Sequence, residues 1–122
     1  MAKKITQLLK YLATNPDTTI RYKRSDMVLW VHSDASYLSF PKAQSRAGGM
    51  HFLSNKPPSP NNPANSKPTL NRIVFVVYKI LRNIMASAAE AELGDFFFNC
   101  QEAVTIGIML EEMGHSQPPP PI

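Results

Sequence analysis

Three carboxylates stand where metal-assisted chemistry is possible. Asp34 follows residues 27–33, an apolar and aromatic run that predicts a buried strand. Glu90 and Glu92 lie in the first turns of a helix predicted to open at Ser87. Carboxylates on two separate elements can converge on Mg²⁺, and two-metal nucleases use them to activate water and stabilise the leaving oxygen. An Asp after a strand is more often a turn residue, and a Glu in a first helical turn more often serves the cap or the helix dipole, so both interpretations stay open.

The elements that must position these residues begin with a helix over residues 3–13, whose Ile5, Leu8, Leu9 and Leu12 share one apolar face. β-branched and aromatic residues predict strands at 27–33, 50–54 and 72–79, and a short edge strand at 19–24. Residues 45–49 are predicted to form a turn. The proline- and asparagine-rich segment 55–71 is expected to be an extended, poorly ordered loop.

The C-terminal part is predicted to form two successive helices, separated by a break near residues 101–104. Ser87 and Glu90 match a capping box at the start of the first helix. A core-facing stripe is expected from residues at helical spacing: Leu93, Phe96, Phe97 and Cys100. Cys100 is therefore expected to be a buried small hydrophobe, and Trp30 a core residue of its strand. The order of helix, strands and helices indicates an α/β or α+β layered fold.

Charge is distributed unevenly along the chain. All thirteen Lys and Arg residues lie at or before Arg82, where only Asp17, Asp26 and Asp34 oppose them, so residues 1–82 carry a net charge of +10. Such a segment suits a polyanionic partner, although a solubilising surface explains it equally well. The single cysteine excludes an internal disulfide, and no Cys/His spacing suits zinc. No signal peptide or membrane span is evident, so an intracellular protein, cytoplasmic or nuclear, is expected.

Several ordered motifs resemble the ribonuclease H region of copia-type retrotransposon polyproteins. Ser33-Asp34-Ala35-Ser36-Tyr37 is similar to the family's first catalytic-strand motif, and Ser87-Ala88-Ala89-Glu90-Ala91-Glu92-Leu93 to the signature that opens its first helix. Residues 45–49 with 51–54 resemble the second-strand region, and residues 111–115 the segment that leads to the fourth strand. The resemblance divides the chain into a reverse transcriptase tail at 1–25 and a partial ribonuclease H-like domain at 26–122.

The resemblance also assigns roles to residues. Four carboxylates bind two Mg²⁺ ions in this family; Asp34 matches the first and Glu92 the second, while Glu90 keeps its capping role with Ser87. The third is expected just past the fourth strand, which would begin where the chain ends at Ile122, and the fourth has no match either. The implied fold is a partial ribonuclease H-like α/β fold, with a three-stranded antiparallel sheet, two following helices and a short N-terminal helix.

The function implied for the intact parent is Mg²⁺-dependent hydrolysis of RNA in RNA–DNA hybrids during reverse transcription. The implied partners are the hybrid, recognised by shape and 2′-hydroxyls, and the rest of the polyprotein. Six basic residues are candidates for phosphate contacts: Lys3, Lys4, Lys10, Arg21, Lys23 and Arg24. With two of four carboxylates matched, the isolated chain is expected to be inactive. The alternatives are a non-catalytic remnant that binds nucleic acid or a partner, and a retroelement remnant without function.

Overall fold

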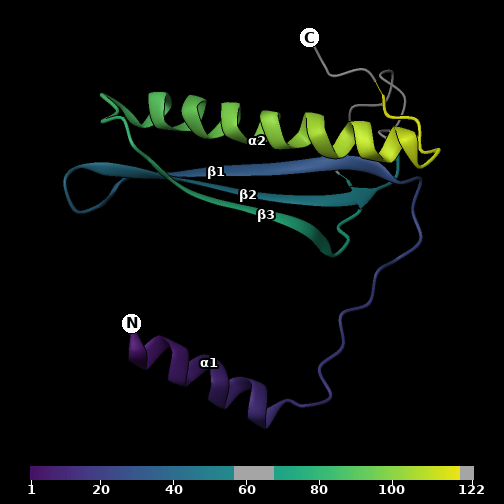
Figure 1. Cartoon of the computed structure of the whole chain (residues 1–122), viewed down its shortest axis with the longest axis horizontal. Coiled ribbons are helices and arrows are strands. Elements are labelled where there is room, and N and C mark those ends of the chain that lie inside the picture. Colours follow the sequence, from purple (N-terminus) through teal and green to yellow (C-terminus); the bar gives the residue numbers. More distant parts are fainter. Residues whose placement is uncertain (57–67, 119–122) are drawn as a thin grey trace.

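The computed structural model describes residues 1–56 and 68–118. Its elements are α1 (Ala2–Thr14), β1 (Val28–Phe40), β2 (Gln44–Ser54), β3 (Ile73–Leu81) and α2 (Ala88–Glu112). The strands form an antiparallel sheet in the order β1-β2-β3, with α2 packed along one face. Figure 1 shows α1 on the other side of the sheet, where it contacts no other helix or strand. The expected mixed α/β class with a three-stranded antiparallel sheet is confirmed.

The strands are longer than their apolar runs. β1 continues to Phe40, so Asp34 lies within the strand and not after its end. The turn predicted at 45–49 is wrong, because these residues belong to β2 and the hairpin turn lies at 41–43. One side of β2 lies buried against α2, and its residues there are small: Ser45, Ala47 and Gly49. In the sequence, this run of small residues resembles a turn.

No strand forms at residues 19–24, contrary to the prediction. This segment is extended but is held by a side chain instead of a strand ladder. Asn71 donates from Nδ2 to the Lys23 carbonyl (2.9 Å) and accepts at Oδ1 from the Lys23 amide (3.0 Å). Tyr22 also donates its hydroxyl to the Ile73 carbonyl (3.2 Å). Most of the predicted 55–71 loop lies outside the described residues.

α2 is one continuous helix, so the predicted break near 101–104 is wrong. The predicted core stripe is also wrong: Leu93, Phe96 and Phe97 are each more than half exposed, and Cys100 is exposed. The residues of α2 that face the sheet are offset from that stripe, and the buried ones are Ala91, Asp95, Asn99 and Leu110. Small side chains on β2 let the helix approach closely, and only short side chains fit the space that remains.

A small core sits between α2 and the sheet. Its buried centre is Ala47, Leu81 and Ala91, with Ala35, Met85 and Phe98 packed around it. No helix in the described part of the chain packs on the opposite sheet face. Trp30, which was expected in the core, is only half-buried there. Within the described ranges, no helix is long and apolar enough to cross a membrane.

Candidate functional site

The structure brings the predicted catalytic segments to one place. A pocket of about 490 Å³ lies between β1 and the first turns of α2. Asp34, Glu92 and Asp95 are its acidic lining residues, and Ser33 and Ala35 line it from β1. The two elements are neighbours because α2 packs along β1 and β2. Residues 58 positions apart in sequence therefore share one surface depression.

Register decides how Asp34 is presented to this pocket. β1 pairs with β2 without interruption from Val28 to Ser36, and Asp34 lies opposite Gly48. Alternation then places Ser33 and Ala35 in the row facing α2, and Asp34 in the row of Trp30 and His32 on the other face. The exposed Asp34 side chain therefore leaves the sheet on the face turned away from α2, and it lies near the outer edge because β1 is an edge strand.

The start of α2 separates the roles of its two glutamates. Ser87 is the N-cap, and its Oγ accepts a hydrogen bond from the Glu90 amide (3.2 Å). The Glu90 carboxylate turns back to accept from the Ala86 amide (2.6 Å), one residue before the cap. Glu92 makes no such capping contact, and it is exposed at the pocket. Local capping thus engages Glu90 and leaves Glu92 available to a ligand.

Asp95 is a third acid beneath the pocket, which the sequence analysis did not single out. Its side chain is only 1% exposed. Burial raises the pKa of the Asp95 carboxyl above its ordinary value of 3.8, and the nearby charge of Asp34 raises it further. Hydrogen bonds from the backbone amides of Gly48 and Asp34, and from the Asn99 side chain, oppose that rise in the pKa. Asp95 is therefore bound to protein groups and contributes structure beneath the exposed carboxylates.

Asn99 links Asp95 to a buried histidine. Its Nδ2 donates to the Asp95 carboxylate (2.8 Å) and to the Gly48 carbonyl (3.3 Å), while its Oδ1 lies 3.2 Å from His51 Nε2. His51 is fully buried, contacts the Phe75 ring edge-on, and leaves Nδ1 without a hydrogen-bond partner. Burial lowers the pKa of His51 below its ordinary value of 6.5, although Asn99 and the charge of Glu102 oppose this. His51 is therefore a neutral structural residue.

Glycine at position 49 makes this network possible. A Cβ added to Gly49 would collide with the Asn99 amide group. A Cβ on Gly48 would lie 3.1 Å from the Asp34 carbonyl oxygen, tighter than ordinary packing. The two glycines thus let a polar helix face approach the sheet backbone directly.

A sequence signal for this network existed. Asp95 and Asn99 lie four residues apart, so they share a helix face with Ala91. Asp and Asn are poor helix formers in a helix interior, where they compete for backbone hydrogen bonds. Two of them on one face therefore indicate a specific partner, which here is the glycine-lined backbone of β2. The more conspicuous Leu and Phe residues of α2 obscured this pattern.

The predicted nucleic-acid contacts are all exposed but lie away from the pocket residues in sequence and structure. Lys3, Lys4 and Lys10 are on α1, and Arg21, Lys23 and Arg24 are in the segment that joins α1 to β1. Further cations lie on the sheet: Arg46 stacks over Phe40 and Tyr78, and Lys79 over Phe98, at 4.1 to 4.7 Å from the ring centroids.

Glu92 offers exposed carboxylate oxygens, which suit a hard divalent cation, at this pocket. Asp34 lines the pocket from the edge strand β1, but register turns its side chain toward the face away from α2. Mg²⁺ often binds through one or two carboxylates and keeps several waters. Among the residues that the structure describes, no group of three or more His, Cys, Asp or Glu side chains is placed to hold a metal ion. An ion shared by Asp34 and Glu92 would therefore require the Asp34 carboxylate to reach around the outer edge of β1, and it would keep most of its waters.

Comparison of the chain with known proteins returned no family model, no curated protein and no solved structure that matches it.

Proposed function

We propose that this chain is part of a copia-type retrotransposon polyprotein, comprising the end of the reverse transcriptase and a partial ribonuclease H-like domain. The observation that carries the proposal is the pocket lined by Asp34 and Glu92. These are the two carboxylates that the resemblance selects, and they come from separate elements. The capping contact of Glu90 supports the same choice, because it removes the competing glutamate.

The course of the chain after α2 is consistent with such a domain. Gln117 accepts a hydrogen bond from the Leu29 amide (2.9 Å) and donates one to the Met27 carbonyl (3.0 Å). The chain that follows α2 therefore returns to the outer edge of β1, where a further strand can pair. A fourth strand at that edge would lie next to Asp34 and would bring any carboxylate it carried to the same pocket.

In the intact parent, Asp34 and Glu92 would hold Mg²⁺, which supplies an activated water and neutralises charge on the scissile phosphate. The chain's own contribution is positioning. The Asp95–Asn99–His51 network fixes α2 against the β2 backbone and so fixes the distance of Glu92 from β1. Exposed cations on α1 and on the following segment supply sequence-independent attraction to the hybrid backbone.

The direct test is metal binding at the pocket. Mn²⁺ added to the ¹⁵N-labelled full chain should broaden amide signals of residues 33–36 and 88–95 first. The double variant Asp34→Asn and Glu92→Gln should lose this effect, while the exposed control Glu112→Gln should keep it. Broadening that begins elsewhere, or that survives the double variant, would refute the site assignment.

Cleavage of a labelled RNA–DNA hybrid with Mg²⁺ or Mn²⁺ is the accompanying assay. No turnover is expected from the 122-residue chain, because the sequence matches two of the family's four carboxylates. Turnover that disappears on Asp34→Asn would show that this pair suffices and would overturn the expectation of inactivity. The non-catalytic alternative predicts hybrid binding that is indifferent to both divalent ions and the double variant.

A further inference from the structure

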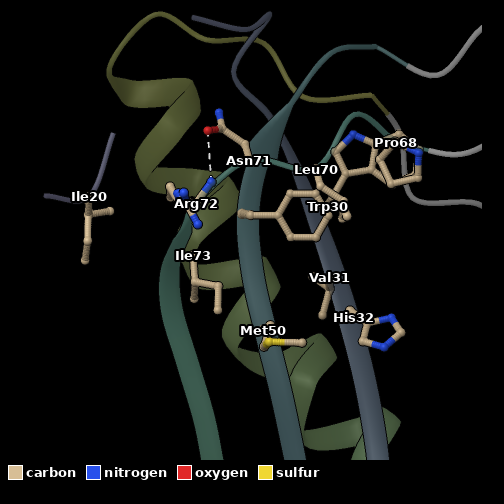
Figure 2. A pocket seen from close by; sticks show the side chains of 11 residues that line it. Ile20, Trp30, Val31, His32, Met50, Pro68, Leu70, Asn71, Arg72 and Ile73 are labelled. Atoms are coloured by element: carbon tan, nitrogen blue, oxygen red, sulfur yellow. Dashed lines mark hydrogen bonds between the residues drawn. The ribbon is translucent and has the colours of Figure 1, made fainter. Parts of the chain in front are cut away.

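The sheet face turned away from α2, here called the open face, is apolar, and no helix or strand of the described residues covers it. By register it carries Trp30 and His32 of β1 and Met50 and Phe52 of β2, with residues of β3 beside them. Val76 is 58% exposed and Tyr78 is 64% exposed on this face. A groove of about 1100 Å³ runs along it, and Figure 2 shows Trp30, Met50 and Ile73 along this groove. Large exposed apolar patches of this kind usually mark a binding surface.

α1 carries a second exposed apolar surface, on the convex side of a helix that contacts no other helix or strand. Ile5, Leu8, Leu9 and Leu12 are each more than half exposed, and α1 has no buried residue. A helix of about 13 residues is only marginally stable in water without a packing partner. An amphipathic helix of this length is therefore expected to pack its apolar face against another surface.

The connecting segment already leads to the open face. Ile20 lines the groove, and Tyr22 and Lys23 are hydrogen-bonded to Ile73 and Asn71 at its rim. Figure 1 shows α1 on the same side of the sheet as this face. Residues 15–19 alone separate the end of α1 from Ile20 and span at most about 17 Å when extended. A tether this short holds the helix at an effective concentration on the order of millimolar.

We propose that α1 folds back within the same molecule and covers the open face, with Ile5, Leu8, Leu9 and Leu12 against Trp30, Met50 and Phe52. The sheet would then be sandwiched between α1 and α2, with apolar contacts on both faces. Lys3 and Lys10 would remain on the solvent side of α1, at the helix positions opposite Ile5 and Leu12. The proposal does not depend on the nuclease proposal, since it uses neither Asp34 nor Glu92.

Trp30, which is the single tryptophan of the chain, reports the contact. In a Cys100→Ser background, a bimane dye on Ala13→Cys flanks the apolar face of α1, whereas the dye on the matched control Gln7→Cys points away from it. Docking predicts that Trp30 quenches the dye at position 13 more than at position 7. The quenching should be independent of protein concentration and should disappear on Trp30→Phe.

A label-free measurement guards against effects of the dye. Leu9 is 60% exposed, so Leu9→Asp should leave the sheet folded while it weakens docking. Acrylamide quenching of Trp30 should increase in Leu9→Asp and stay unchanged in the matched variant Gln7→Asp. Equal dye quenching at positions 7 and 13, or equal acrylamide quenching in the two Asp variants, would refute the proposal. Quenching that increases with concentration would assign the face to a second copy and would also refute it.

Discussion

Asn99 is the residue whose removal should most disturb the interface between α2 and the sheet. Its amide group serves Asp95, His51 and the Gly48 carbonyl at once. In Asn99→Ala the buried His51 keeps no hydrogen-bond partner, because its Nδ1 already has none. Asp95 loses its side-chain donor in the same change. A buried polar group left without a partner costs about 1–3 kcal/mol. His51 becomes such a group, whereas Asp95 keeps hydrogen bonds from the Gly48 and Asp34 amides, so a loss of about 1–3 kcal/mol is expected.

A loss of this size is a large fraction of the stability of a small domain, which is about 5–15 kcal/mol. Urea unfolding of the full chain, followed by Trp30 fluorescence and circular dichroism, measures it. With a denaturant slope of about 1 kcal/mol per molar, the midpoint should fall by about 1 M or more. Gln101→Ala is the matched control, because Gln101 is exposed on the same helix and its change should stay within about 0.5 kcal/mol.

A double-mutant cycle identifies the network as the cause. If Asn99 and His51 are coupled, Asn99→Ala and His51→Leu should be non-additive by about 0.5–3 kcal/mol. An Asn99→Ala midpoint equal to that of Gln101→Ala would refute the buried network. A large loss with strict additivity would instead indicate that Asn99 acts through packing alone.

Three further outcomes are expected. Gly49→Ala should destabilise the fold by about 1–3 kcal/mol in the same urea assay, because the added Cβ collides with Asn99. The control Gly107→Ala should not destabilise the fold, because the space around Gly107 is open. Burial lowers the pKa of His51, so below pH 6.5 the unfolded chain binds a proton that the folded chain does not. The free energy of unfolding should therefore fall as the pH is lowered from about 8 to about 5. The variant His51→Leu should lose less stability over this range. Binding of the RNA–DNA hybrid should weaken as the salt concentration rises. Replacing a cation of residues 1–82 that contacts a phosphate should reduce the slope of log binding constant against log salt concentration by about one. A binding constant that does not change with salt would mean that the charge is only solubilising.

The acid pair illustrates what a sequence can and cannot provide. The choice of Glu92 over Glu90 rests on motif resemblance and on capping chemistry, and capping is local enough to be derived from four consecutive residues. The common pocket of Asp34 and Glu92 depends on the packing of α2 along β1, which no local pattern specifies. The side of the sheet on which Asp34 emerges depends on register, and a shift of one residue would reverse it.

The sequence by itself determined the elements whose signals are short-range: the amphipathic α1, the strand runs of β1 and β3, and the Ser87 cap. Only the tertiary structure decided which face of α2 is buried. Hydrophobic periodicity selected the Leu93 and Phe96 stripe, yet the helix presents Asp95 and Asn99 to the sheet. The physical reason is that the small residues of β2 let α2 come close enough for Asn99 to bond the Gly48 carbonyl, so short hydrogen-bonding side chains fit there and bulky apolar ones do not.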